Sequence, residues 1–432
     1  MRIAIVDTDR CQPRKCSLEC VKFCPGVRTG DETIVFDESN GKPVISEELC
    51  TGCGICPKKC PFGAIAIVGL PEELKKDLIH QYGENAFRLF RLPYPRENSV
   101  TGIIGQNGIG KTTIAKILSG DIIPNFGDFE NSDKEAVIEY FSGVQFYDYF
   151  RALYGGNLKA VHKPQYVDYL PRVVSGEVGK LLEKADERGN LRQIIHDLEL
   201  GNTIDRNINE ISGGELQRVA IAAAILREAD VYIIDEPSSY LDVRQRLMVA
   251  GIIRDLAIEK RVLVVEHDLI VLDYLADYIS MMYGQVRAYG IVSHPRTVRQ
   301  GINVYLGGYL KEENIRFRTV AMRFEVRPPS QAWKSETLLK FTDIRKAYEH
   351  FDLEVKGGEI KKGEVLGILG PNATGKTTFV KILAGVVEPE EGEVDADVRV
   401  SYKPQYIKPE TDKTVLDILV EATDLSSSFF QS

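Results

Sequence analysis

The chain has 432 residues, of which 44% are hydrophobic and 27% charged, and its net charge is −9. This composition is typical of a globular protein with about two or three domains, and the negative charge argues against a protein that coats nucleic acid. No run of 18 or more apolar residues occurs, so the sequence predicts no membrane-spanning helix. The first residues, MRIAIVDTDRC, lack the apolar segment of a secretory signal, and we expect a cytoplasmic protein without membrane partners.

All eight cysteines lie before residue 61. The second group, CTGCGICPKKCP, has the C-x2-C-x2-C-x3-C-P spacing that bacterial ferredoxins use for [4Fe-4S] clusters. The first group, CQPRKCSLECVKFCP, is spaced more loosely but also ends in Cys-Pro. Because the fourth cysteine of each run binds the other cluster, the sequence predicts two clusters. One is held by Cys11, Cys16, Cys20 and Cys60, and the other by Cys50, Cys53, Cys56 and Cys24.

Other interpretations of these cysteines stay open. Two zinc sites with four thiolates each are the main alternative, and disulfides are a weaker one in a reducing cytosol. The chain has no flavin or haem motif beside the clusters, so we favour a structural role for them over electron transfer.

Two phosphate-binding loops follow. SVTGIIGQNGIGKTTIAKILSG predicts a buried strand at 100–104, a G-x-x-x-x-G-K-T loop and a helix, and EVLGILGPNATGKTTFVKILAG repeats this unit with Ala-Thr where the first has Gly-Ile. Backbone N–H groups and the lysine bind phosphate in such loops, and the threonine hydroxyl binds Mg2+. The predicted nucleotide ligands are Gly105, Asn107, Gly108, Gly110, Lys111, Thr112 and Thr113, and in the second loop Gly370, Asn372, Gly375, Lys376, Thr377 and Thr378, with Thr112 and Thr377 on magnesium.

Three further motifs follow the first loop: ISGGELQR at 211–218, VYIIDEPSSYLD at 231–242 and LVVEHD at 263–268. In this order they resemble the signature, Walker B, D-loop and switch histidine of ATP-binding-cassette (ABC) ATPases. Asp235 ends an apolar strand and is suited to hold Mg2+, while Glu236 is placed to polarise the attacking water. His267 is expected to contact the γ-phosphate.

The remaining candidates come from the signature, from a repeated KPQY and from two tyrosines. Ser212, Gly213, Gly214 and Glu215 begin a helix whose N–H groups suit a γ-phosphate held by an opposing cassette. The glutamines of HKPQY and YKPQYI, Gln165 and Gln405, are expected to sense Mg2+ and the water. Tyr82 and Tyr348 are candidates for stacking on adenine, with core aromatics as the alternative.

The repeated KPQY also allows the lengths of the two cassettes to be compared. Lys111 and Gln165 are 54 residues apart, whereas Lys376 and Gln405 are 29 apart, so the first cassette has an insertion of 54 − 29 = 25 residues. Its sequence near 131–157 predicts a helix-loop-helix whose aromatic residues favour partner binding over a simple surface loop. By the same measure, the second signature and Walker B would lie beyond Ser432. We therefore expect a truncated second cassette and poor hydrolysis by this chain alone.

A twin-cluster ferredoxin module joined to two ABC cassettes resembles the ribosome-recycling RNase L inhibitor family. The resemblance implies an ABC-type P-loop NTPase of α/β fold behind an α+β ferredoxin-like domain, with [4Fe-4S] clusters, ATP or ADP and Mg2+ as cofactors. It also implies that ATP drives the splitting of ribosomes. The implied partners are the small ribosomal subunit with its RNA, a release factor or Pelota-like rescue factor, and initiation factors. The predicted parts are a ferredoxin-like domain (1–72), a first cassette (73–294), a hinge (295–334) and a second cassette (335–432).

The hinge has eight Lys or Arg against three Glu, a balance of 8 − 3 = +5, which by charge alone fits a phosphate-facing patch and a solvated linker equally well. The family resemblance favours contact with RNA. Two other functions fit some of the motifs. An ABC ATPase for redox or metallocluster assembly would use the cysteines, and a soluble transporter ATPase subunit would use the cassettes alone.

Overall fold

The computed structural model describes residues 2–38, 40–69, 72–129, 132–323, 336–348, 351–395, 400–404 and 413–422. The chain divides into two units, Met1–Val326 and Arg327–Ser432. Among the described residues, no helix has both the length and the apolar character needed to cross a bilayer.

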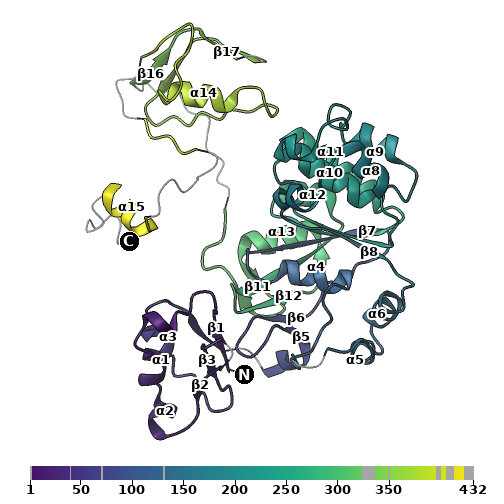
Figure 1. Ribbon diagram of the computed structural model, residues 1–432, viewed down its shortest axis with the longest axis vertical. Helices are drawn as coiled ribbons and strands as arrows, with labels where there is room; N and C mark the ends of the chain where they lie inside the picture. The colour runs from purple at the N-terminus through teal and green to yellow at the C-terminus, as the bar shows by residue number, and fades with distance from the viewer. Residues whose placement is uncertain are drawn as a thin grey trace. The chain divides into compact units, whose positions relative to one another are not determined.

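The first part of unit one is a small α+β domain (purple in Figure 1). Both faces of its first strand, β1, are buried, because successive side chains of a strand point to opposite sides. Ala4 and Val6 pack with the cysteine loops, whereas Ile3 and Ile5 belong to the core of the following cassette. Two antiparallel pairs, β1 with β4 and β2 with β3, frame short helices. The bounds are β1 Arg2–Val6, η1 Pro13–Lys15, α1 Glu19–Lys22, α2 Pro25–Thr29, β2 Ile34–Phe36, β3 Pro43–Ile45, α3 Ile55–Lys59 and β4 Ile65–Gly69.

The cassette is built on a nine-stranded sheet, along which the order is β5-β6-β12-β11-β7-β10-β9-β8, with β13 paired to β11. The five strands from β11 to β8 are parallel, and they are apolar at successive positions because helices cover both faces. Val262 and Val264 face one hydrophobic core while Leu263 and Val265 face the other. The bounds are β5 Leu78–Gln81, β6 Arg88–Phe90, β7 Ser99–Gly105, β8 Ala160–Lys163, β9 Val231–Asp235, β10 Arg261–Val265, β11 Tyr278–Gln285, β12 Tyr289–Val292 and β13 Arg296–Thr297.

The helices begin at residues suited to helix starts. Ser212 and Glu215 form a capping box at α10, and Asp242 with Gln245 forms another at α11. Helices α8 to α12 gather in one group in Figure 1. The bounds are η2 Glu72–Asp77, α4 Lys111–Ser119, η3 Val167–Tyr169, α7 Leu170–Val173, α8 Val178–Ala185, α9 Leu191–Asp197, η4 Ile208–Glu210, α10 Gly213–Ile225, α11 Val243–Leu256 and α12 Leu269–Leu275.

Two helices, α5 (Lys134–Tyr140) and α6 (Phe146–Tyr154), occupy the stretch predicted as an insertion. Their aromatic side chains stack mainly on one another: the rings of Phe141 and Phe150 are 5.1 Å apart, and Tyr149 and Phe150 are buried. The hydroxyl of Tyr149 donates to the carbonyl of Leu118 in α4 at 2.6 Å. The aromatic richness that favoured partner binding is therefore explained largely by packing against the cassette.

The segment predicted as a hinge is partly folded onto the first cassette. It contains α13 (Val298–Gly307), β14 (Tyr309–Leu310) and β15 (Ile315–Arg316). Gly301 and Leu310 are buried, and Leu310 belongs to the cassette core. Residues up to at least Phe317 thus pack as part of unit one rather than as a free linker.

Unit two has less regular structure among its described residues. The predicted strand before its phosphate loop is absent: residues 364–370 form no strand, and Val365 and Leu369 are exposed. In the first cassette the matching strand β7 lies between β10 and β11, and no described strand of unit two takes their place. The bounds are β16 Thr337–Phe341, β17 Ile344–Tyr348, β18 Phe351–Val355, β19 Gly358–Lys361, α14 Lys376–Leu383, β20 Val394–Asp395 and α15 Val415–Ala422.

Candidate active site

The first phosphate loop joins the buried strand β7 to helix α4. Lys111, at the start of α4, donates from Nζ to the carbonyls of Gly105 and Gln106 at 2.9 and 3.0 Å and to Asn107 Oδ1 at 3.2 Å. Burial lowers the pKa of Lys111 to about 8, against the opposing effect of Asp235 and Glu236. Gly110 has φ of 99°, and a Cβ there would lie 2.5 Å from Phe87, so only glycine fits this turn.

Two carboxylates stand at the end of β9, beside this loop. Asp235 is 1% exposed, and burial together with the neighbouring Glu236 raises its pKa to about 6. Its Oδ2 has no hydrogen-bond partner among the residues that the structure describes. A buried carboxylate oxygen without a donor fits a cation, because desolvation without a partner is costly.

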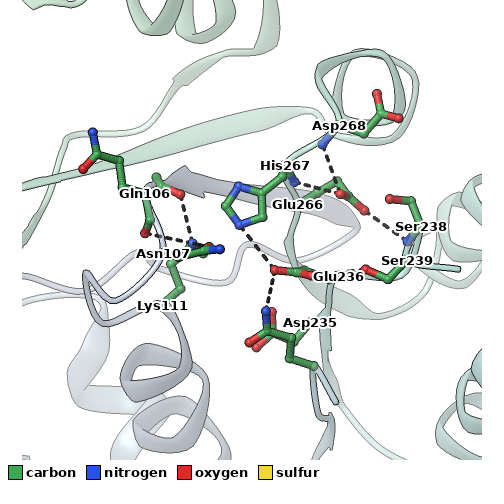
Figure 2. A network of polar contacts seen from close by, with 12 residues as sticks. Gln106, Asn107, Lys111, Asp235, Glu236, Ser238, Ser239, Glu266, His267 and Asp268 are labelled. Atoms are coloured by element: carbon green, nitrogen blue, oxygen red, sulfur yellow. Dashed lines mark hydrogen bonds and ion pairs between the residues drawn. The ribbon is translucent and has the colours of Figure 1, made fainter. Parts of the chain in front are cut away.

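Glu236 is the centre of a polar network (Figure 2). Its Oε1 accepts from Gln165 Nε2 at 2.7 Å and lies 3.3 Å from His267 Nε2, and its Oε2 accepts from Ser239 Oγ at 3.1 Å. The hydrogen bond with His267 is the main cause that lowers the pKa of Glu236. The structure thus brings together all four predicted catalytic residues of the first cassette, Gln165, Asp235, Glu236 and His267, around one point.

Three supporting residues were not found from the sequence. Lys163 is 2% exposed and donates from Nζ to the carbonyl of Asp235 at 2.9 Å, and burial lowers its pKa to about 8. Gln217 Nε2 donates to the carbonyl of Glu236 at 2.7 Å. Glu266 is 2% exposed, and its carboxylate accepts from the backbone N–H groups of Ser238 and His267. The signal for Lys163 was available, since the repeated KPQY contains this lysine as well as the glutamine.

The signature residues lie elsewhere on the cassette. Ser212 Oγ accepts from the Glu215 N–H at 3.3 Å, and Glu215 Oε1 also accepts from Arg206 at 3.1 Å. These contacts fix the first turn of α10, where Gly213 and Gly214 supply the open N–H groups. None of the four residues from Ser212 to Glu215 lines the cavity that holds Lys111 and Asp235. The signature is therefore free to face a different nucleotide.

A cavity of about 1070 Å3 adjoins the phosphate loop. Lys111, Thr112, Thr113, Gln165 and Asp235 line one part of it. Tyr82 lies on its wall with 52% of its surface exposed, and its hydroxyl is 3.1 Å from Thr113 Oγ1. An exposed ring beside the phosphate loop suits base stacking better than the alternative of a core aromatic.

The ferredoxin-like domain supplies another wall of this cavity, including Asp7, Phe36 and Lys42. Arg287 connects the two: its N–H donates to the carbonyl of Gly108 at 3.0 Å, and its guanidinium pairs with Asp7 at 2.8 Å. The carbonyl of Asp7 in turn accepts from the N–H of Cys11 at 3.0 Å. Asn85 makes a second connection by hydrogen bonds to β1 and β3.

The eight cysteines are free thiols that fall into two groups. Cys11 and Cys20 interact electrostatically with Cys16 and Cys60. Cys56 interacts with the second group, and burial raises its pKa to about 12. A small cavity is lined by the cysteines of that group, Cys24, Cys50, Cys53 and Cys56.

The second phosphate loop is more exposed than the first. Lys376 Nζ donates to the carbonyl of Gly370 at 2.7 Å and to that of Pro371. Ala373 has φ of 63°, so it adopts the left-handed conformation that Gly108 has with φ of 75°. Tyr348 ends β17 with 48% of its surface exposed. Gln405 lies outside the described residues.

Comparisons with known proteins identify the domains of this chain and its relatives. The ABC transporter family model matches residues 95–239 and 355–422, the model described as "Possible Fer4-like domain in RNase L inhibitor, RLI" matches 1–32, and the 4Fe-4S binding domain matches 43–66. An uncharacterized ABC transporter ATP-binding protein of Methanocaldococcus jannaschii is 57% identical over 436 residues, which cover all of this chain and 72% of that protein.

Two solved structures are similar as well. One, "Model of ribosome-bound archaeal Pelota and ABCE1", has a TM-score of 0.92 at 53% identity over 100% of this chain and 72% of the other. The other is the complex of archaeal ribosomal stalk protein aP1 with the archaeal ribosome recycling factor aABCE1, with a TM-score of 0.78 at 52% identity over 83% and 70%.

The fold and the site define an ABC-type ATPase with a 4Fe-4S ferredoxin-like domain, which confirms the predicted fold class. The chain belongs to the RNase L inhibitor family, as its sequence motifs predicted.

Proposed function

We propose that this protein is an ATP-driven ribosome-recycling factor of the cytoplasm, which splits ribosomes into subunits and stays on the small subunit. The observation that carries the proposal is the similarity of the whole chain, with a TM-score of 0.92, to a protein described on the ribosome with Pelota. The partners we propose are the small subunit and its RNA, a release factor or Pelota-like rescue factor, and initiation factors. The basic side chains at the end of unit one, such as Arg299 and Arg316, are candidates for RNA contact.

We propose that the first cassette hydrolyses ATP with the residues gathered around Glu236. Lys111 and the N–H groups of its loop bind the phosphates, and Tyr82 stacks on the base. Thr112, Gln165 and Asp235 would hold Mg2+, and the unpartnered Oδ2 of Asp235 supports this assignment. When bound, the ion neutralises charge on the phosphates. Glu236 accepts a proton from the attacking water, and His267, 3.3 Å from it, orients that carboxylate and contacts the γ-phosphate.

The second phosphate loop is proposed to bind a second nucleotide. Lys376 and the N–H groups of its loop would contact the phosphates, and Tyr348 would stack on the base. The signature of the first cassette is proposed to contact the γ-phosphate of a nucleotide held by an opposing cassette. The remaining proposed ligands are Gly370, Asn372, Gly375, Thr377, Thr378 and Gln405, with Thr377 and Gln405 on magnesium, and Ser212, Gly213, Gly214 and Glu215 from the signature.

We propose two [4Fe-4S] clusters in the ferredoxin-like domain, with the crossed ligand sets that the Cys-Pro spacing predicts. The grouping of the thiols supports this, because Cys11 and Cys20 have Cys60 as a neighbour, and Cys56 has Cys24. The ferredoxin spacing of the second cysteine run also supports [4Fe-4S] clusters over the zinc alternative.

Co-sedimentation with small ribosomal subunits tests the proposed function. We expect the full-length protein to sediment with the subunits when a non-hydrolysable ATP analogue is present, and much less with ADP. A Lys111→Ala, Lys376→Ala double variant is the matched control, because it should lose the nucleotide dependence. Equal sedimentation in all nucleotide states, or none in any, would contradict the proposal. An iron-sulfur paramagnetic signal that changes reversibly with ATP turnover would favour the metallocluster alternative instead.

A further inference from the structure

Glu266 is a buried acid between strand β10 and the predicted switch residue His267. Its Oε1 accepts from the N–H of His267 at 2.7 Å and from that of Asp268 at 3.1 Å. Its Oε2 accepts from the N–H of Ser238 at 3.2 Å, on the chain that follows Glu236 (Figure 2). The two oxygens thus bind two separate loops.

The backbone of Glu266 is also fixed. Its N–H donates to the carbonyl of Ile103 at 3.1 Å, in the strand that leads into the phosphate loop. The residue therefore joins three parts of the site: the strand before the phosphate loop, the loop of His267 and the loop after Glu236. Two of these parts meet at the proposed hydrolytic residues, where His267 Nε2 lies 3.3 Å from Glu236 Oε1.

A merely structural role would not require an acid here. Burying a carboxylate is costly, and a side chain 2% exposed that only filled space would be better as an apolar residue. The charge is balanced by several N–H donors and by the ammonium of Lys163, which interacts electrostatically with Asp235, Glu236 and Glu266. Hydrogen bonds to a carboxylate are stronger than neutral ones, so they hold loops more rigidly.

We propose that Glu266 is a positioning residue for ATP hydrolysis, which holds His267 against Glu236 by tying the switch loop to the loop after Walker B. This rests on the proposed roles of Glu236 and His267. Glutamine cannot replace Glu266, because both oxygens of Glu266 accept from N–H groups and an amide has only one acceptor oxygen. The NH2 group of glutamine, a donor, would face either the Ser238 N–H or the N–H groups of His267 and Asp268. Glu266→Gln therefore keeps the volume of the side chain but breaks one side of the tie.

The test compares six full-length proteins: wild type, Glu266→Gln, His267→Ala, the double variant of these two residues, Glu236→Gln and a control. We expect Glu266→Gln to lower kcat by about tenfold or more, while nucleotide affinity changes by less than about twofold. In the His267→Ala background, Glu266→Gln should cause no further loss, because coupled residues are not additive. Glu259→Gln, an exposed acid ahead of β10, is the matched control and should leave kcat unchanged.

Each outcome bears on one proposal. Unchanged kcat in Glu266→Gln, or losses that multiply in the double variant, would overturn the positioning role. Full activity of His267→Ala or Glu236→Gln would instead overturn the proposed hydrolytic roles. If Glu266→Gln does not fold, amide hydrogen exchange of the wild-type protein tests whether Glu266 ties the two loops together. The N–H groups of Ser238, His267 and Asp268 should then be protected from exchange although they lie outside strands. Exchange at the rate of exposed loops would refute the tie.

Discussion

Replacing Asn85 should loosen the ferredoxin-like domain from the first cassette. Asn85 is 2% exposed, and its side chain forms hydrogen bonds with β1 and β3 of that domain. Oδ1 accepts from the Ile45 N–H at 2.6 Å, while Nδ2 donates to the carbonyls of Ala4 at 3.1 Å and Ile45 at 2.9 Å. Because Asn85 has φ of 54°, glycine is the replacement that removes these bonds without straining the backbone.

The structure gives the size of the effect. A neutral hydrogen bond contributes about 1 kcal/mol, so Asn85→Gly removes about 3 kcal/mol from the contact between the domains. Each 1.4 kcal/mol is tenfold in an equilibrium constant, so the population of the detached domain should rise by about a hundredfold. The hydrogen bond from the Val6 N–H to the Asn85 carbonyl stays, since it needs only the backbone.

Amide hydrogen exchange with the clusters loaded measures this. The Val6 N–H, which keeps its acceptor on residue 85, should lose about two decades of protection in Asn85→Gly, because opening of the interface exposes it. Asn98→Gly is the matched control, since Asn98 also has a left-handed φ of 50° but is exposed. If the Val6 N–H exchanges equally slowly in wild type, Asn85→Gly and Asn98→Gly, the side-chain bonds of Asn85 do not hold the domains together.

Four further predictions concern the site, the clusters and stability. Glu236→Gln should slow phosphate release by a factor of about 10² or more while ATP still binds, and wild-type turnover would exclude Glu236 as the base. Cys56→Ser should lower the iron content by about half, since its thiol belongs to one of two groups; loss of all the iron would show that the clusters depend on each other. Tyr149→Phe should lower the free energy of unfolding in urea by about 1–2 kcal/mol, because the Leu118 carbonyl loses its buried donor, whereas Tyr166→Phe, 62% exposed, should not. Burial lowers the pKa of His80 below 6.5, so the unfolded chain binds a proton more tightly than the folded chain, and stability falls as the pH drops below about 6.5. In thermal melts, His80→Gln should lose less stability at low pH than wild type. His196→Gln, whose side chain is 86% exposed in wild type, should lose as much as wild type.

The sequence alone predicted which residues gather at the first phosphate loop, because their motifs are local. Lys111 follows its glycines directly, and Glu236 and His267 each follow shortly after an apolar strand. Their supporting residues were not predictable in this way. Gln217 reaches the carbonyl of Glu236 from helix α10, and Lys163 reaches Asp235 from strand β8, across 72 residues of chain. Such contacts depend on the sheet order, which no short motif states.

Two predicted segments differ for a similar reason. The apolar run at 364–370 has the pattern of a buried strand, yet a strand needs neighbours, and none is described beside it. The stretch at 295–334 was predicted as a hinge from the family resemblance, but Ile302 in α13, Leu310 in β14 and Phe317 after β15 pack on the cassette core. Charge composition described the outer surface of this segment and not its buried side.

Arg287 links the first phosphate loop to the first cysteine loop of the ferredoxin-like domain. Its backbone touches the phosphate loop at Gly108, and its side chain holds Asp7, whose carbonyl binds the amide of Cys11. A ligand that displaced the phosphate loop would therefore also displace the segment that carries Cys11, so the first cassette and the first cysteine loop would move together at this point.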